Sequence, residues 1–299
     1  MKNNLYKAAG VLSLAVMLTA CGTETSQSDT TQTLQGESVE ESTAQTQEAQ
    51  SEQTQETFAT EQENAAEDII TELKAGVALS VDGLQLVLDD IQVDPENEEI
   101  KQIIAQYGDQ SLEVDQALAL DKAYYVQKQG QNYVLVETST YDDYSIVYVL
   151  TLENGAITKT DQVDGSLIQV PAQPDGAFTI ESRVNVLGTY GGQLQYNLQD
   201  GKMAADGTLY QFLNPVDDYT ITLTVAGEIS CRLDGGNTTL KAGEVIQPTG
   251  YSQDGTFYFQ MEDGTAGSFI VDLDGEGQYA GTIDGVSEYD LFENLPYAG

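Results

Sequence analysis

Residues 123–160 read AYYVQKQGQNYVLVETSTYDDYSIVYVLTLENGAITKT, and this stretch decides the fold of the chain. It holds four runs rich in Val, Ile, Thr and Tyr, at 123–128, 132–139, 144–152 and 156–160. These residue types favour β-strands. The breaks between the runs contain Gly130, Asp142-Asp143 and Asn154-Gly155, which are typical of turns. The pattern therefore predicts a meander of antiparallel strands.

Asp-Gly pairs extend the same pattern along the chain. There are ten of them, starting at residues 82, 164, 175, 200, 206, 234, 254, 263, 274 and 284. The first joins two alternating runs, VALSV (77–81) and LQLVL (84–88), which is a strong hairpin signal. In the second half of the chain the pairs recur at the short spacing of hairpins in a sheet or barrel.

Two segments favour short helices within this mostly β chain. The first, ENAAEDIITELKAG (63–76), would place Ile69, Ile70 and Leu73 inward. The second predicts a helix near 95–107, since Pro95 suits a first helical position and Gly108 a C-terminal stop. Four residues of this helix are expected to lie on one face and to point into the protein core: Ile100, Ile103, Ile104 and Tyr107.

The turn-rich sequence NPVDDY around Pro215 is the expected boundary between two β domains. Residues 67–214 are predicted to form an antiparallel β domain that contains the helix near 95–107. Residues 218–299 are predicted to form a small β-barrel that folds by itself. The apolar chain end, with Tyr289, Phe292, Leu295 and Tyr297, is expected to cap that barrel.

The segment TLKAGEVIQPTGYSQDGTFYFQMEDGTAGSFIVDL (239–273) resembles the bacterial SH3-like family, in which a KxGE turn, an aromatic strand and a Gly-rich strand follow in this order. The resemblance implies an SH3-like β-barrel over about residues 218–272. Phe257 stands where that family has tryptophan, and Ser268-Phe269 replace its aromatic-Val pair. We therefore carry over the fold and not the family's aromatic peptide- or peptidoglycan-binding groove.

The N-terminus has the layout of a secretory signal peptide over residues 1–20: Lys2 and Lys7, a short apolar run, then small residues. The sequence Leu18-Thr19-Ala20-Cys21 resembles the bacterial lipobox. That resemblance implies cleavage before Cys21 and a diacylglycerol anchor on its thiol, with the protein held at the extracellular face of a Gram-positive-type membrane. An ordinary signal peptide with a nearby cysteine is the alternative. The chain end GVSEYDLFENLPYAG also resembles that of surface lipoproteins of Gram-positive gut bacteria.

Residues 21–66 are dominated by Thr, Ser, Gln and Glu, and their only charges are acidic. Such a composition cannot offset the entropy of ordering the chain, so we expect a disordered tether between the lipidated Cys21 and the folded part. The whole chain has a formal net charge of −38. A surface of this sign repels phosphate backbones, and nucleic acid is excluded as a partner.

Composition also limits the chemistry. The chain has no His, which removes Ser-His and Cys-His nucleophile pairs and histidine metal sites. With Cys21 lipidated, the second cysteine, Cys231, has no disulfide partner and is interpreted as a buried thiol in a strand. No catalytic residue, cofactor site or metal site is predicted.

The sequence contains two weaker site patterns. Asp272, Asp274, Glu276 and Gly277 fit part of an EF-hand-like calcium loop, but Ile283 occupies the position of its bidentate Glu, so a hairpin turn is favoured. A group of tyrosines could form a glycan or peptide platform, although packing within the sheet is favoured. These tyrosines are Tyr124, Tyr125, Tyr133, Tyr141, Tyr144 and Tyr148.

Two functions remain open from the sequence. The favoured one is a non-catalytic binding or accessory module at the cell envelope, with a cell-wall or extracellular glycan or peptide as ligand. The alternative is a histidine-free glycan hydrolase that uses two carboxylates. A deep cleft lined by two close carboxylates would favour the hydrolase, and its absence the binding module.

Overall fold

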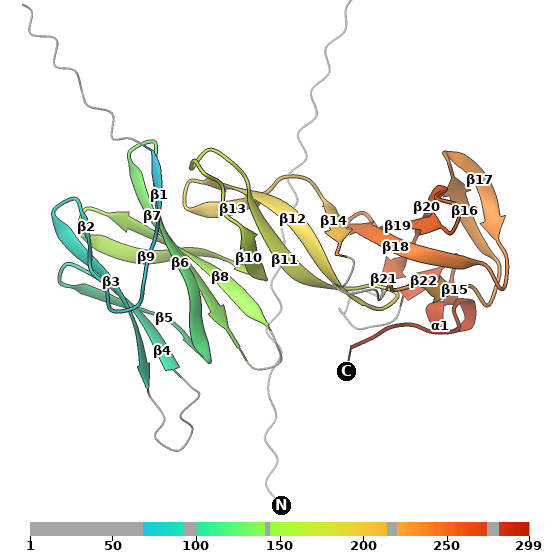
Figure 1. Cartoon of the computed structure of the whole chain (residues 1–299), viewed down its shortest axis with the longest axis horizontal. Coiled ribbons are helices and arrows are strands. Elements are labelled where there is room, and N and C mark those ends of the chain that lie inside the picture. The colour runs from blue at the N-terminus through green and yellow to red at the C-terminus, as the bar shows by residue number, and fades with distance from the viewer. Residues whose placement is uncertain (1–67, 93–100, 141–143, 214–219, 274–280, 299) are drawn as a thin grey trace, which may run out of the picture. The chain divides into compact units, whose positions relative to one another are not determined.

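The computed structural model describes residues 68–92, 101–140, 144–213, 220–273 and 281–298 (Figure 1). These residues form antiparallel sheets and one short helix, α1 (Glu288–Leu291), so the mostly β class is confirmed. The described residues all belong to one compact unit, 61–299. The predicted signal peptide, Cys21 and the tether lie outside the described residues.

The middle sheet contains the predicted meander. Its strands follow in the order β1-β6-β7-β8-β9, and each pair is antiparallel. Their bounds are β1 (Ile69–Glu72), β6 (Ala119–Lys128), β7 (Gln131–Ser139), β8 (Ser145–Glu153) and β9 (Ala156–Asp164). Four consecutive antiparallel strands, β6 to β9, are the arrangement that the sequence predicts for residues 123–160.

A second, four-stranded sheet precedes most of the meander in the chain. It runs in the order β2 (Leu79–Val81), β3 (Leu84–Gln92), β4 (Lys101–Tyr107) and β5 (Gln110–Ala117). The turn between β2 and β3 is the predicted Asp82-Gly83 hairpin, with φ of 50° and 78°. Both residues of such a turn need positive φ, which glycine adopts without strain and aspartate tolerates.

The third sheet is the longest and reaches into the C-terminal part of the chain. Its main path is β10-β11-β12-β14-β18-β19-β20-β16-β17, with β13 also on β12 and β15 also on β18. The first strands are β10 (Ser166–Gln169), β11 (Phe178–Asn185), β12 (Thr189–Gln199), β13 (Lys202–Ala205) and β14 (Leu209–Phe212). The later ones are β15 (Leu223–Thr224), β16 (Ile229–Leu233), β17 (Gly236–Leu240), β18 (Val245–Ser252), β19 (Thr256–Met261) and β20 (Ala266–Ile270).

The middle sheet is buried on both faces. On one face, Val134, Val136 and Leu150 pack with the four-stranded sheet. On the other face, Leu135 and Val149 pack with β10–β13. Because neighbouring residues of a strand point to opposite faces, the two cores use alternate positions of the same strands. The three sheets therefore form three layers in this part of the molecule, with β6, β7 and β8 in the middle (Figure 1).

The prediction of a helix near 95–107 is wrong for the described residues of that range, because residues 101–107 form the strand β4. Ile103, Ala105 and Tyr107 are buried at alternate positions, with 0%, 0% and 1% exposure. The apolar residues of this short segment fit a period of two as well as the helical period. Pairing with β3 and β5 decides for the strand.

The other predicted helix is also wrong in its described part. Residues 69–72 form β1, which pairs with β6 in the register Ile69↔Gln127 to Glu72↔Tyr124. The backbone N–H of Leu73 continues this pairing by donating to the carbonyl of Ala123 at 2.8 Å. Without β1, the backbone N–H and C=O groups along one edge of β6 would have no partner in the sheet. Pairing of residues 69–72 as a strand satisfies these groups, and this favours the strand over a helix.

The long sheet crosses the expected domain boundary. The boundary residues, 214–219, lie outside the described part of the chain. On either side of them, however, β14 pairs with both β12 and β18. The expected SH3-like barrel is not observed in this form, because the strands of the described C-terminal part do not close on themselves.

The C-terminal core includes the tip of the β11–β12 hairpin. Val184, Val186, Leu187 and Tyr190 from that tip are buried among residues of β15–β20. The ring of Tyr190 stacks on Phe212 with a centroid distance of 4.3 Å and an interplanar angle of 8°. The hairpin and β14 thus supply part of the interior that the sequence assigned to residues 218–299 alone.

The chain end packs over the same hairpin tip, after the small sheet β21 (Asp272–Leu273), β22 (Gly281–Ile283) and β23 (Val286–Ser287). Phe292 is buried in the C-terminal core, as predicted, whereas Tyr289 is 59% exposed. The backbone N–H of Thr189 donates to the carbonyl of Pro296 at 3.0 Å. Gly188 lies beneath this segment, where a Cβ would stand 2.7 Å from Pro296 Cγ. Residues 288–298 therefore act as a strap across the hairpin tip, and we call them the C-terminal strap.

We expect Leu135→Ala and Leu150→Ala to destabilise the protein by similar amounts. Both side chains are fully buried, on adjacent strands and on opposite faces of the middle sheet. Each deletion should lower the free energy of unfolding by about 2–5 kcal/mol. Urea unfolding measures both, with the exposed Thr158→Ala on β9 as control. A loss in only one of the two variants would contradict burial on both faces.

The sequence predicts that residues 218–299 fold alone, but the packing in the whole chain leads us to expect that this fragment is too unstable to do so. It lacks Val184, Val186, Leu187 and Tyr190, which are worth about 1.5–3 kcal/mol each when fully buried. A whole domain is stable by about 5–15 kcal/mol. We expect poor amide dispersion in the NMR spectrum of 218–299 and better dispersion for 177–299. Equal dispersion of both spectra would show that the hairpin tip is dispensable.

Candidate functional site

The two cysteines have different positions. Cys21, the predicted lipidation site, lies outside the described residues. Cys231 lies on β16 and is 6% exposed within the C-terminal core, so the predicted buried thiol is confirmed. Burial raises the pKa of the Cys231 thiol. A thiol that is buried and protonated is a poor nucleophile.

The tyrosine group does not form one surface. Tyr125 and Tyr148 are buried against the four-stranded sheet, whereas Tyr133 is buried on the other face of the middle sheet. Tyr124 is partly buried, Tyr141 lies outside the described residues, and Tyr144 is 38% exposed. The favoured interpretation, packing within the sheet, is therefore confirmed for the buried members.

The aromatic residues of the SH3-like segment also belong to the core. Phe257 is 0% exposed and Phe269 is 4% exposed. Their rings stack at a centroid distance of 5.3 Å. Residues packed in this way offer no face to a ligand, so the structure supports leaving the family's binding groove out of this chain.

The calcium pattern is described only in part. Asp272 is exposed on β21 and Ile283 is buried on β22, whereas Asp274, Glu276 and Gly277 lie outside the described residues. Among the described residues no group of three or more metal-ligating side chains is found.

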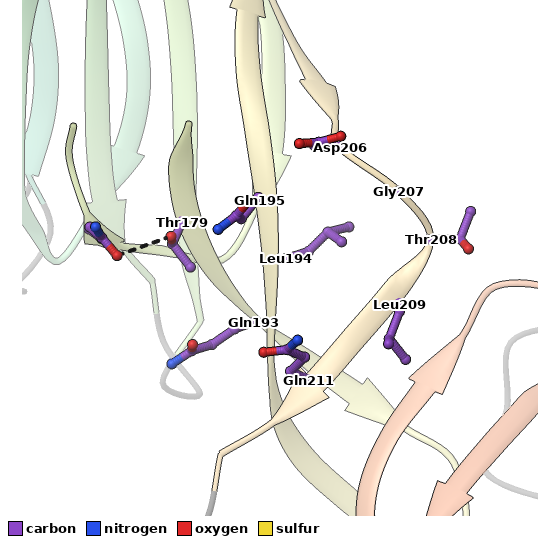
Figure 2. Close-up of a pocket in the computed structure, with 10 residues that line it drawn as sticks. Thr179, Gln193, Leu194, Gln195, Asp206, Gly207, Thr208, Leu209 and Gln211 are labelled. Carbon is purple, nitrogen blue, oxygen red and sulfur yellow. Dashed lines mark hydrogen bonds between the residues drawn. The ribbon is translucent and has the colours of Figure 1, made fainter. Parts of the chain in front are cut away.

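One surface hollow lies on the outer face of the long sheet and has a volume of about 380 Å³. It is built by β10, β11, β12, β14 and the connection from β13 to β14. The ten residues that line it are Gln169, Thr179, Gln193, Leu194, Gln195, Asp206, Gly207, Thr208, Leu209 and Gln211. Four of the ten are glutamines, and we call this hollow the amide groove (Figure 2).

The strand register explains why the glutamines gather there. Gln195 lies opposite Thr179, and Gln193 lies opposite Gln211 on the next strand. Residues that face each other across paired strands, and those two positions apart on one strand, share a face of the sheet. In Figure 2, Gln193 and Gln195 extend from β12 toward Thr179, whereas Leu194 points to the opposite side. Leu194 is itself buried in the core between the long sheet and the middle sheet.

Most of these amide groups are unused within the protein. Thr179 donates a long hydrogen bond, 3.5 Å, to the side-chain oxygen of Gln169. For Gln193, Gln195 and Gln211 no side-chain hydrogen bond to another protein group is found in the described part of the chain. Their carboxamides are therefore free to pair with solvent or a ligand, as donors and as acceptors.

Another hollow, of about 290 Å³, lies beside the β6–β7 and β12–β13 turns. Its one ammonium group is already engaged, because Lys128 Nζ donates to the carbonyl of Leu198 at 2.8 Å. The phenol of Tyr133 is paired with the side chain of Gln131. This hollow thus offers fewer free polar groups than the amide groove.

Two buried carboxylates lie away from both hollows. Glu137 on β7 is 2% exposed and accepts hydrogen bonds from Lys122 Nζ at 3.1 Å, from Ser166 Oγ at 2.5 Å and from the backbone N–H of Leu167 at 2.9 Å. Lys122 Nζ also donates to the carbonyl of Leu167 at 2.7 Å. These contacts join the middle sheet to β10 and leave the carboxylate well satisfied, so we assign Glu137 a structural role.

Glu288, the second buried carboxylate, holds the C-terminal strap. It is 0% exposed and accepts hydrogen bonds from the backbone N–H of Gly281 at 2.7 Å and from the hydroxyl of Tyr297 at 2.5 Å. No salt bridge to it is found among the described residues. Burial raises the pKa of the Glu288 carboxyl, and the two hydrogen bonds oppose this rise only in part. Burial and the nearby Glu288 also raise the pKa of Tyr190.

Sequence reasoning missed the amide groove. The only signal for it is the alternation of Gln193 and Gln195 in GGQLQYN, which marks one outward face of a strand. Nothing in the sequence links that face to Gln169 or Gln211, because their proximity arises from strand pairing.

Comparison with known proteins gives no further constraint, since no protein-family model, curated protein or solved structure matches the chain. Within the described ranges, no helix has the length and apolar character needed to cross a membrane.

We expect Glu288→Gln to change how stability depends on pH. The folded state raises the pKa of Glu288, so it binds this proton more tightly than the unfolded chain does. The stabilisation is complete below the unfolded pKa, about 4.3, and is lost as pH rises through the higher folded pKa. Glutamine stays neutral and can keep both hydrogen bonds, because its oxygen accepts from Gly281 and its amide donates to the Tyr297 oxygen.

The stability gained by Glu288→Gln should therefore grow as pH is raised from about 4 to 7. Urea unfolding at several pH values measures this difference. The exposed Glu293→Gln on the same strap is the control, because it removes the same unit of negative charge. Parallel pH curves for wild type and Glu288→Gln would contradict a raised pKa at this site.

Proposed function

We propose that this chain is a lipid-anchored protein of the extracellular membrane face. Its β-sheet region after residue 67, which we call the β body, would act as a non-catalytic binding or accessory module. The observation that carries the binding part of this proposal is the amide groove. Its polar groups are mostly carboxamides and hydroxyls. Thr179 makes a long contact with Gln169, and Thr208 pairs with Ser252 at 2.9 Å, but no side-chain hydrogen bond to a protein group is found among the described residues for Gln193, Gln195 and Gln211. Such groups recognise a ligand by hydrogen bonding without reacting with it.

The same lining argues against the hydrolase alternative. Glycoside hydrolysis by carboxylates needs two of them about 5–10 Å apart on either side of the scissile bond. Among the ten residues that line the groove, Asp206 is the one carboxylate. The buried Glu137 and Glu288 are held by protein hydrogen bonds away from it. A binding module therefore fits the described surface better than a hydrolase does.

The anchor part of the proposal rests on the sequence LTAC at residues 18–21. A lipobox cysteine carries two acyl chains as diacylglycerol, and two chains give stable membrane attachment where one is marginal. Residues 21–66 would then act as a spacer of roughly 35–40 Å between the membrane and the β body. The strong negative charge of the chain adds no attraction to anionic lipid, so the lipid itself must provide the attachment.

We expect Cys21→Ser to abolish lipid attachment and to leave uncleaved precursor or protein shed into the medium. Native protein should partition into the detergent phase, and mass spectrometry should find diacylglycerol on an N-terminal Cys21. Cys231→Ser is the matched control: its thiol is buried in the C-terminal core, so the substitution should leave membrane attachment unchanged. An unmodified N-terminus in the mature protein would refute the anchor.

A further inference from the structure

The amide groove differs in charge from the chain that carries it. The sequence has 49 acidic residues against 11 basic ones. Of the ten residues that line the groove, only Asp206 is charged, and no lysine or arginine is among them. An anionic ligand would meet a repelling protein without a cation to bind it, and a cationic ligand would find a single carboxylate. The composition of the groove therefore favours a neutral ligand.

The chemistry of the lining narrows the ligand further. Each glutamine carboxamide presents donors and an acceptor. The hydroxyl groups of a sugar have the same dual character, so one face of a saccharide can pair with several of these groups at once. The threonine hydroxyls contribute less, because Thr208 is paired with Ser252 at 2.9 Å and Thr179 makes a long contact with Gln169. Gln193, Gln195 and Gln211 lie together on one face, directly or diagonally opposite one another across β12 and β14.

An extended peptide fits the groove less well. Peptides that bind sheets usually add a strand to an open edge. Here the edge of β12 that borders the groove is already paired. Gln193 lies in the ladder with β14, and the carbonyl of Gln195 accepts a hydrogen bond from the backbone N–H of Asp206 at 2.7 Å. The lining holds two aliphatic side chains, Leu194, which is 4% exposed, and Leu209, which is 40% exposed, so a single leucine is available to the side chains of a peptide.

The strands beneath the groove are fixed from the other side. Leu194 and Tyr196 of β12 are buried in the core shared with the middle sheet. Phe212 of β14 stacks on Tyr190 in the C-terminal core. The backbone positions of Gln193 and Gln211 are therefore held by two cores, and binding requires only the ordering of their side chains. This arrangement reduces the entropy lost on binding.

From these observations we propose that the amide groove binds a neutral, hydroxyl-rich saccharide, with Gln193 and Gln211 at its centre. The proposal rests on the proposed binding function and names its site and ligand class. Glutamine side chains lose considerable rotamer freedom when they are ordered, so the affinity for one saccharide is expected to be weak. Several copies anchored on one membrane could together hold a polymeric glycan much more tightly.

The test uses the full mature protein in mild detergent, on an array of neutral oligosaccharides, uronic-acid and sulfated oligosaccharides, and neutral peptides. Isothermal titration then measures the affinity of each neutral saccharide that binds. We expect Gln193→Ala combined with Gln211→Ala to weaken that binding about tenfold or more, because several hydrogen bonds are lost. Gln162→Ala is the matched control, since Gln162 is exposed on β9, outside the groove. Both variants should keep the wild-type melting temperature.

Each other outcome overturns the proposal in a recognisable way. Undiminished saccharide binding by the double variant would move the site elsewhere and leave the binding function standing. Binding of a peptide or a charged glycan that the double variant loses would keep the site and replace the ligand class. The absence of binding to every neutral saccharide would reject the proposal, whereas the membrane attachment tested through Cys21 would be unaffected.

Discussion

The structure depends on the burial of β7 and β8 on both faces. Val134 and Leu150 contact the core on the side of the four-stranded sheet, and Leu135 and Val149 contact the core on the other side. A sheet that is buried on both sides needs a layer over each face, and the chain before and after the meander supplies those layers. The middle sheet therefore determines that β2–β5 and β10–β13 lie on opposite sides of it.

The C-terminal core depends on this arrangement in turn. The β11–β12 hairpin has one end packed on the middle sheet, through Phe178 and Ile180, and its tip packed in the C-terminal core, through Leu187 and Tyr190. The C-terminal strap closes over the tip, with the buried Glu288 bonded to Gly281 and Tyr297. The hairpin is thus shared by two cores. Its outer face stays open between them, and the amide groove lies there.

This arrangement separates stability from recognition. The buried residues of β12 and β14 fix the backbone, whereas the outward residues are not needed for packing and are free to serve another purpose. In an otherwise strongly acidic chain, that outward surface presents carboxamides and hydroxyls. If the lipid on Cys21 holds the protein at the membrane, residues 21–66 would let such a surface reach ligands of the envelope.

The sequence by itself determined the class and the local pairing. Alternation and turn chemistry identified the strands of residues 123–160 and the Asp82-Gly83 hairpin, because these signals depend on neighbours in the chain. The same local rules failed at 101–107, where a short apolar segment fits two periods and pairing with β3 and β5 decides.

Tertiary structure alone decided three further features: the double burial of the middle sheet, the continuity of the long sheet across the expected boundary, and the amide groove. The last two depend on β14, which joins Gln211 to Gln193 on one side and to Gly250 on the other. The physical reason is that contacts between residues distant in the sequence arise from packing of whole sheets. Local composition does not encode which faces will meet.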